Sequence, residues 1–294
     1  MKKDTGILLV GHGSRIPYNK RVIKEVAEKY AKTMPEYNVE IGFMELVEPN
    51  IPTAFNKLKK TGVKRIIVNP IFLAHGMHTK VDIPTILTLE PMKIEGHHHS
   101  HSHGHHHHHD RQAKSEPVEF DGEIIYLEPL GADDKIVDIV EERIKTELSK
   151  YPDASGENTG ILLAGHGSSL PYNNEVIETI AEKYIERTPG YPIEAGFMRL
   201  SKPSIPESFN KIKDTGVERV IVVPVFLAEG IHTKLDIPTT LNLEPEPIEN
   251  YPEPNVSRTD VIEFDGEIIY TRPLGADDKI VEIVSERIKP YLDE

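Results

Sequence analysis

GILLVGHGS, residues 6–14, is a short apolar run that ends in Gly11-His12-Gly13-Ser14. Such a run predicts a strand buried on both faces of a parallel sheet, leading into a tight turn. Downstream, Val22, Val26 and Tyr30 recur at helical spacing. The segment therefore predicts a strand, a turn and a helix, the first unit of an α/β fold.

The elements expected after this unit alternate in the same way. The apolar pattern predicts strands at Val39–Leu46, Ile66–Leu73 and Glu123–Leu127, and helices at Pro52–Lys60, Ile83–Leu89 and Asp134–Lys145. Alternation at this spacing is typical of a doubly wound, flavodoxin-like parallel sheet with helices on both faces. Ligands of such sheets bind outside the carboxyl ends of the strands, where His12 lies.

The whole pattern occurs twice. Residues 6–90 and 160–244 align without a gap, and 52 of the 85 aligned pairs are identical. Residues 119–137 match 263–281 at 17 of 19 positions. We therefore expect two tandem α/β domains related by internal duplication, repeat 1 at residues 1–150 and repeat 2 at 156–294, with a seam near Tyr151–Asn158.

Composition excludes several classes of protein. The formal net charge of -14 disfavours nucleic-acid binding, and no basic stripe with interleaved aromatic residues offsets it. There is no apolar run long enough for a membrane helix and no signal-peptide pattern, so we expect a cytoplasmic protein without a membrane partner. With no cysteine, disulfides, thiolate zinc sites and cysteine-bound iron–sulfur clusters are excluded. Any metal must be held by nitrogen and oxygen.

One low-complexity segment interrupts repeat 1. A segment of His, Ser and Gly cannot bury enough apolar surface to fold, so we expect a disordered loop at residues 96–111. Imidazole suits zinc, copper, nickel and cobalt, which makes this tract a candidate metal reservoir. A purification tag is the less favoured interpretation, because the tract is internal and interrupted. Its histidines are His97, His98, His99, His101, His103, His105, His106, His107, His108 and His109.

Four of the remaining histidines form two matched pairs. His12 and His166 occupy Gly-His-Gly-Ser, while His78 and His232 occupy Gly-x-His-Thr-Lys-x-Asp-Ile-Pro. Each pair follows strands whose carboxyl ends share one edge of the sheet, so we expect its members to project into one cleft. A single such histidine is more often a surface residue. Two that persist in both copies, while about two fifths of the aligned positions changed, favour a metal ligand or a proton acceptor.

Two features have simpler alternatives. Gly11 and Gly13 permit a tight strand-to-helix turn whatever the histidine does. Asp82 and Asp236 lie four residues after the second histidine of each pair. They either orient that histidine or favour a helix N-terminus, and the sequence slightly favours the helix role.

These motifs resemble those of the class II tetrapyrrole chelatases, specifically the CbiX type of sirohydrochlorin cobaltochelatase and the similar nickelochelatase. The resemblance covers both halves nearly end to end. It rests on Gly11–Ser14, on Phe43 with Glu45 and Glu48 before Pro49, and on Phe-Leu-Ala-x-Gly-x-His-x-x-x-Asp-Ile-Pro within Pro70–Pro84. Short members of the family pair as homodimers. The resemblance therefore implies a monomer that acts as a fused pseudo-dimer.

The resemblance also implies an activity and its residues. The activity is insertion of Co²⁺ or Ni²⁺ into sirohydrochlorin for cobalamin or nickel-tetrapyrrole synthesis, with the metal as substrate and no permanently bound cofactor. His12 and His78 would bind the metal and His12 would also accept a pyrrole proton, with His166 and His232 as their equivalents. Candidates for binding the tetrapyrrole are Glu45, Glu48, Leu73, Ala74, His75, Gly76, Met77, Arg199 and Lys202, with Arg15, Lys80 and Lys234 as further basic residues.

The copies differ at positions that bear on this activity. Glu45 and Glu48 of the first copy become Arg199 and Lys202 in the second, and His75 becomes Glu229. Surface drift explains any one change. Two acid-to-base changes three residues apart suggest specialised halves, the first for metal and protons and the second for the carboxylates of sirohydrochlorin.

Two other functions compete with chelation. A nickel or cobalt carrier would use the histidine tract and need no catalysis. A histidine phosphatase would use His12 as a phosphoryl acceptor, but that family requires arginine immediately before the histidine, where this chain has Gly11. We rank the chelatase first, the carrier second and the phosphatase third.

Overall fold

The computed structural model describes residues 3–94, 116–251 and 261–292 of the chain. The expected disordered loop at 96–111, with all ten of its histidines, lies outside these ranges. The described elements of the first half are β1 (Thr5–Gly11), α1 (Tyr18–Thr33), β2 (Asn38–Phe43), α2 (Ile51–Lys59), β3 (Arg65–Pro70), a π-helical turn (His78–Asp82), α3 (Ile83–Ile86), β4 (Glu123–Tyr126) and α4 (Asp134–Leu148).

The second half repeats this order. Its elements are β5 (Thr159–Gly165), α5 (Tyr172–Arg187), β6 (Ile193–Phe197), α6 (Ile205–Lys213), β7 (Arg219–Pro224), a second π-helical turn (His232–Asp236), α7 (Ile237–Thr240), β8 (Glu267–Tyr270), α8 (Asp278–Ile288) and a 3₁₀ turn (Lys289–Tyr291).

Each half contains a four-stranded parallel sheet, in the order β2-β1-β3-β4 and β6-β5-β7-β8. The all-parallel α/β class and the internal duplication expected from the sequence are thereby confirmed. In both sheets the strand that carries Gly-His-Gly is central, so it is fully buried along its length. Its carboxyl end presents the histidine between two neighbouring strands.

Some elements end earlier than the apolar pattern predicts. The expected strand Val39–Leu46 ends at Phe43, because the chain turns there and Phe43 N–H donates to the Pro49 carbonyl at 2.9 Å. The expected strand Ile66–Leu73 ends at Pro70, which has no N–H to continue the ladder. The expected helix Ile83–Leu89 is α3, shorter at its end and preceded by the π-helical turn.

The outer face of each sheet carries the helices that follow its second and third strands. In the first half, Ile51, Phe55 and Leu58 of α2 pack with Leu8 and Val10 of β1 in one buried cluster. The second half has an equivalent cluster built from α6 and β5. These two outer cores are separate.

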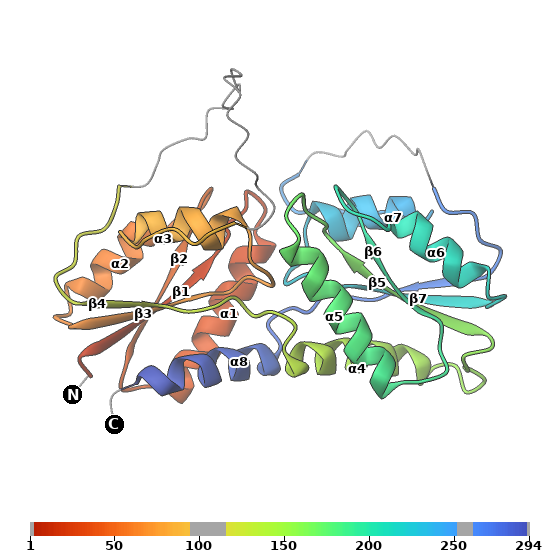
Figure 1. Ribbon diagram of the computed structural model, residues 1–294, viewed down its shortest axis with the longest axis horizontal. Helices are drawn as coiled ribbons and strands as arrows, with labels where there is room; N and C mark the ends of the chain where they lie inside the picture. Colours follow the sequence, from red (N-terminus) through yellow and green to blue (C-terminus); the bar gives the residue numbers. More distant parts are fainter. Residues whose placement is uncertain (1–2, 95–115, 252–260, 293–294) are drawn as a thin grey trace, which may run out of the picture.

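The other face of each sheet, opposite the outer core, is covered partly by a helix from the other repeat. In Figure 1, α8 lies beside α1 under the first sheet, and α4 lies beside α5 under the second, so each repeat lends its last helix to the other. The sequence repeats and the packed units therefore differ by one helix each.

One arginine fixes each exchanged helix, a buried one (Arg143) on α4 and a half-buried one (Arg287) on α8. Arg287 of α8 donates to the carbonyls of Glu128 at 2.8 Å and of Leu130 at 2.7 Å, and also to Pro129. Arg143 of α4 donates to the Leu274 carbonyl at 2.9 Å. Each arginine thus binds the loop after the last strand of the opposite half.

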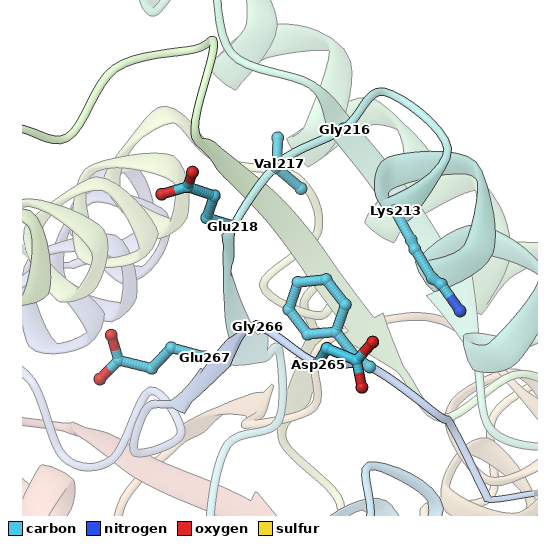
Figure 2. Close-up of a pocket in the computed structure, with 8 residues that line it drawn as sticks. Lys213, Gly216, Val217, Glu218, Asp265, Gly266 and Glu267 are labelled. Carbon is cyan, nitrogen blue, oxygen red and sulfur yellow. The ribbon is translucent and has the colours of Figure 1, made fainter.

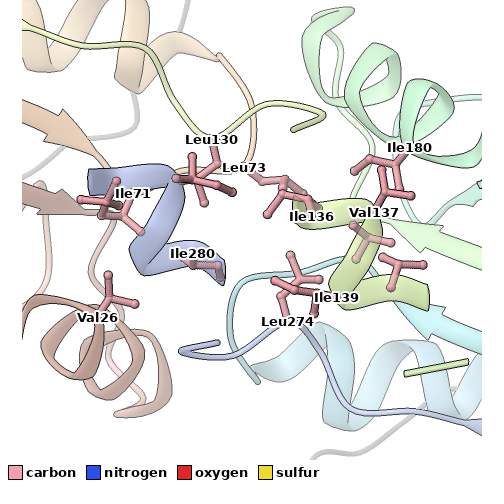
Figure 3. Close-up of a cluster of buried hydrophobic side chains, with 14 of the residues drawn as sticks. Val26, Ile71, Leu73, Leu130, Ile136, Val137, Ile139, Ile180, Leu274 and Ile280 are labelled. Carbon is pink, nitrogen blue, oxygen red and sulfur yellow. The ribbon is translucent and has the colours of Figure 1, made fainter. Parts of the chain in front are cut away.

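The exchange joins the two halves through one core. Ile136 and Ile139 of α4 and Ile280 of α8 belong to a single buried cluster that contains residues of both sheets (Figure 3). Polar pairs line this junction as well, such as Lys135 with Glu286 at 2.9 Å and Lys279 with Glu142 at 2.5 Å. The halves consequently share their largest apolar core.

The helices are modest in length and amphipathic. Across the ranges that the structure describes, none of them combines the length and the apolar character that crossing a membrane requires.

Candidate functional site

The glycines around His12 shape the turn that presents it. Gly13 has φ +89°, and a Cβ there would come within 1.9 Å of the Glu45 carbonyl oxygen. Its N–H donates to Asn19 Oδ1 at 3.2 Å. The turn therefore requires glycine for conformation and for space, and it brings His12 beside the residues that follow β2.

His78 begins the π-helical turn that precedes α3. The Nδ1 of His78 lies 2.7 Å from Asp82 Oδ2, one turn later. Tyr126 of β4 donates its hydroxyl to the Thr79 carbonyl at 2.8 Å, which ties this turn to the sheet. π-helical turns are rare in proteins, and those that occur are often found at functional sites. Asp82 therefore does orient His78, the role that the sequence slightly disfavoured.

The first histidine pair gathers an acidic neighbour. The His12 and His78 ring centroids are 4.9 Å apart, and His12 Nε2 lies 3.6 Å from Glu45 Oε1. One ligand atom from each of these three residues lies within 4.8 Å of the others. In His12 the Nδ1 is 2.8 Å from the Gly13 carbonyl, to which it must donate. Both histidines thus have Nε2 as their available ligand atom.

The second pair has the same geometry with a different neighbour. The His166 and His232 ring centroids are also 4.9 Å apart, and His232 Nδ1 lies 2.6 Å from Asp236 Oδ2. The Arg199 guanidinium, at the position of Glu45, is 3.8 Å from the same Asp236 oxygen. Within the described part of the chain, no third ligand joins this pair.

Burial favours the neutral imidazole form of His166. Desolvation lowers the pKa of His166 most, the bond to the Gly167 carbonyl opposes this, and the positive charges of His232, Arg199 and His12 lower the pKa by smaller amounts. His166 Nδ1 lies 2.7 Å from the Gly167 carbonyl, to which it donates, so Nε2 carries the free lone pair. The residue is suited to accept a proton.

One cavity of about 390 Å³ spans the two halves beside these histidines. It is lined by His12 and Leu46 of the first half, and by His166, His232 and residues 226–231 of the second. His12 and His166 therefore face a common space.

The candidate residues in the loop after β3, 73–77, differ in exposure and in their contacts. Leu73 is buried in the central core, whereas Met77 is 38% exposed. Ala74 and Gly76 are half-buried. His75 bonds through Nε2 to the Glu128 carboxylate, and its ring lies 6.0 Å from that of Tyr172 in the second half.

Two of the charged candidates serve helix termini. The Glu48 carboxylate accepts from the Asn50 N–H at 2.8 Å, directly before α2. Lys202 binds Glu207 at 2.5 Å, and Glu207 forms a capping box with Ser204 at the start of α6. The charges of Glu48 and Lys202 are therefore engaged away from the histidine pairs, unlike those of Glu45 and Arg199.

The other basic candidates differ in their surroundings. Arg15 is exposed. The Lys80 ammonium lies 4.5 Å from the Tyr172 ring centroid, and Lys234 lies 5.5 Å from that of Tyr18. Each of these two contacts crosses between halves, so they hold the two histidine loops together.

The second-half loop that lines the cavity was missed from the sequence. The candidate set contained 73–77 but not 227–231, the same positions in the other repeat. The ungapped alignment of the repeats was the signal that could have found them. Leu46 and Asn19, which also line the cavity, carried no motif signal.

A larger, open depression of about 770 Å³ lies elsewhere, at the amino ends of β7 and β8. Figure 2 shows its Glu218, Asp265 and Glu267 carboxylates around Gly266, with Lys213 to one side. It lies at the opposite edge of the sheet from the histidines and holds none of the candidate residues.

Comparison with known proteins identifies a family that matches both halves and relatives that match about half of the chain. The CbiX family matches residues 6–147 and again residues 160–291. A sirohydrochlorin cobaltochelatase of Methanopyrus kandleri is 53% identical over 145 residues, which are 49% of this chain and 97% of that protein. One of Methanothermobacter thermautotrophicus is 50% identical over 130 residues, 44% of this chain and 90% of that protein. These relatives are about as long as one half.

Solved structures match the fold of the whole chain. SirB from Bacillus subtilis with Fe³⁺ has a TM-score of 0.68 at 23% identity and covers 98% of this chain and 95% of its own. A SirB from Bacillus subtilis subspecies spizizenii in complex with cobalt gives 0.59 at 20% identity, covering 98% and 94%. The chain belongs to the CbiX family and contains the family's domain twice.

Proposed function

We propose that the protein inserts Co²⁺ into sirohydrochlorin, using one metal site in the first half and the cavity between the halves for the macrocycle. The observation that carries this proposal is the gathering of His12, His78 and Glu45 at a cavity shared with His166. Two imidazoles and a carboxylate suit a divalent transition metal. Relatives about 50% identical over nearly half of the chain are named sirohydrochlorin cobaltochelatases.

The first half would hold the ion. The ligand atoms are His12 Nε2, His78 Nε2 and a Glu45 oxygen, and the negative charge of Glu45 favours the dication. Asp82 accepts from His78 Nδ1–H, which fixes the ring and raises the basicity of the ligating nitrogen. Three protein ligands leave other coordination positions for water and then for the macrocycle.

The exchange of bonds balances without a further reactant. The two pyrrole nitrogens lose their protons, bind the ion and replace its bonds to the protein. Release of the ion frees the His12 lone pair, which accepts one proton, and His166 accepts the other. The burial that lowers the pKa of His166 keeps it unprotonated near neutral pH and ready for this role.

The second half would bind the organic substrate. Arg199 offers a fixed positive charge beside the second histidine pair, where a substrate carboxylate can pair with it. Arg199 also lies beside Asp236, at the place where the first half would hold its metal. A positive side chain therefore takes the position of the ion in the second half. We therefore propose that the chain has one metal site, and that a single chain is the active unit.

The loop at 96–111 is proposed to be a metal reservoir. Deleting Gly96–Arg111 should leave chelation intact at ample Co²⁺ and reduce it only when the metal is scarce. Loss of chelation at ample metal would instead favour the carrier function.

The test is anaerobic absorbance of sirohydrochlorin mixed with the protein and either Co²⁺ or Ni²⁺. A shift to the metallated spectrum faster than the uncatalysed reaction supports the proposal, and the faster metal identifies the preferred substrate. Metal binding with no rate enhancement would replace the chelatase by a metal carrier.

A further inference from the structure

Leu46 has an unusual backbone conformation for a leucine. Its φ is +66°, and Val47 N–H donates across it to the Glu45 carbonyl at 2.9 Å. A bond between residues i and i+2 around a positive φ defines the rarer, strained form of the γ-turn. Leucine is disfavoured there because its Cβ crowds the neighbouring carbonyl.

Burial does not compensate for this conformation. Leu46 is 51% exposed, and its counterpart Leu200, with φ +55°, is 78% exposed. The other described residues with positive φ, glycines aside, are Thr88, Asn242 and Asn250, of which the asparagines tolerate it. Both repeats thus place a large apolar side chain in solvent on a strained turn, a combination that points to function.

The turn is held rigidly beside the first histidine pair. Met44 N–H donates to the Gly11 carbonyl at 3.0 Å, and Glu45 N–H donates to the His12 carbonyl at 3.1 Å. On the far side, the Lys20 ammonium donates to the Glu48 carbonyl at 2.7 Å. Leu46 therefore has a fixed position relative to His12, and it lines the cavity that His12 shares with Phe226 and Leu227.

We propose that Leu46 positions the macrocycle by packing against its face. The inference rests on the proposed function, since it takes sirohydrochlorin as the ligand. A tetrapyrrole has an apolar ring face and carboxylates at its rim. The carboxylates can pair with Arg199 or remain in water, but the face requires apolar partners. Leu46, one residue from the ligand Glu45, places that contact next to the metal.

The variant Leu46→Gly separates this role from a structural one. Glycine relieves the positive φ, so the melting temperature should stay the same or rise. Loss of the contact should raise the KM for sirohydrochlorin by about five- to tenfold, as expected for half of a leucine side chain, with kcat little changed. The affinity for Co²⁺ should not change, because the metal ligands are intact.

Two further variants and one control complete the experiment. Leu46→Asn accepts the conformation but is polar, so it should lose affinity as glycine does. Leu46→Met restores an apolar side chain and should recover most of the parental KM. Ile185→Ala removes another exposed aliphatic residue, 44% exposed on α5, and should have the parental KM.

The readouts distinguish failure of the inference from failure of the proposed function. A parent that binds sirohydrochlorin but does not metallate it contradicts the chelatase, and macrocycle fluorescence in titrations without metal still decides the role of Leu46. Parental binding and KM in Leu46→Gly would overturn the inference. So would a rise in KM accompanied by a lower melting temperature, which would indicate a structural role.

Discussion

The two histidine pairs share their geometry and differ in one neighbour. Both have ring centroids 4.9 Å apart, and in both an aspartate four residues on lies within hydrogen-bond distance of the second histidine. The residue that approaches from the turn after the second strand is Glu45 in one half and Arg199 in the other. We therefore propose that the same backbone provides a cation site in one half and an anion site in the other, according to the charge at one position.

The sharpest test of this asymmetry is alanine substitution in each pair. His12→Ala should lower the chelation rate by about 100-fold or more, since it removes a metal ligand and a proton acceptor. His166→Ala should cost about tenfold, because it removes a proton acceptor alone. Anaerobic single-turnover absorbance measures both rates. Equal losses in the two variants would contradict the division of roles.

Metal stoichiometry tests the role of charge. A protein lacking Gly96–Arg111 should bind one Co²⁺ per chain, and Arg199→Glu in that background should bind two, as isothermal titration can count. The control Arg199→Gln removes the positive charge without adding a ligand and should bind one. Two ions in the loop-deleted parent would disprove the single metal site.

The exchanged helices provide a comparison of stability. Arg287 donates to three carbonyls, whereas the described bonds of Arg143 reach the Leu274 carbonyl and, at 3.4 Å, Asp277. Arg287→Ala should therefore lower the free energy of unfolding by about 2–3 kcal/mol and Arg143→Ala by about 1–2 kcal/mol. Urea unfolding measures both values. The reverse order would show that the carbonyl bonds do not set the stability of the exchange.

The smallest expected effect is on the pH dependence of stability, which should differ between the starts of helices α2 and α6. Bonds from Lys202 and Ser204 lower the pKa of Glu207 from 4.5 to about 2. Between these values the folded state binds fewer protons than the unfolded state, so stability falls as the pH falls through this window. Glu207→Thr, which copies Thr53 of α2, should lose this dependence.

Urea unfolding between pH 2 and 6 checks that prediction through the difference between parent and variant. The difference should be largest above about pH 4.5 and shrink toward pH 2. Thr53→Ser in the first half serves as the control and should follow the parent. A difference that does not vary with pH would mean that Glu207 acts through its packing and not its charge.

Much of the fold is local and was predictable. Buried strands such as Ile7–Val10 are continuous apolar runs, and the alignment of the repeats requires that both halves adopt one topology. The ends of β2 and β3 were misjudged because the apolar pattern continues past them. A turn around Leu46 and the missing N–H of Pro70 stop the strands, and apolar periodicity reports neither effect.

The helix exchange could not be predicted from the pattern. Residues 134–144 of α4 and 278–288 of α8 are identical at 9 of 11 positions, so the two helices present nearly the same apolar face to either sheet. For the site, the position of the histidines after parallel strands predicted that they lie at one edge of the sheet. The alignment of the repeats showed that Arg199 replaces Glu45. The contacts of Glu48 with Asn50 and of Lys202 with Glu207 are local, so capping rules applied to the sequence could have found them. The place of Leu46 at the cavity depends on long-range packing, which only the fold shows.

The exchange of α4 and α8 makes this chain a natural split protein. Cleavage within Tyr151–Asn158 would yield two fragments, each carrying the helix that completes the sheet of the other. Alone, each fragment would have to cover its own sheet with its last helix or leave the apolar residues that Figure 3 shows exposed to water. Together, they should reassemble spontaneously, so complementation from separate polypeptides would be sensitive to any change in either helix.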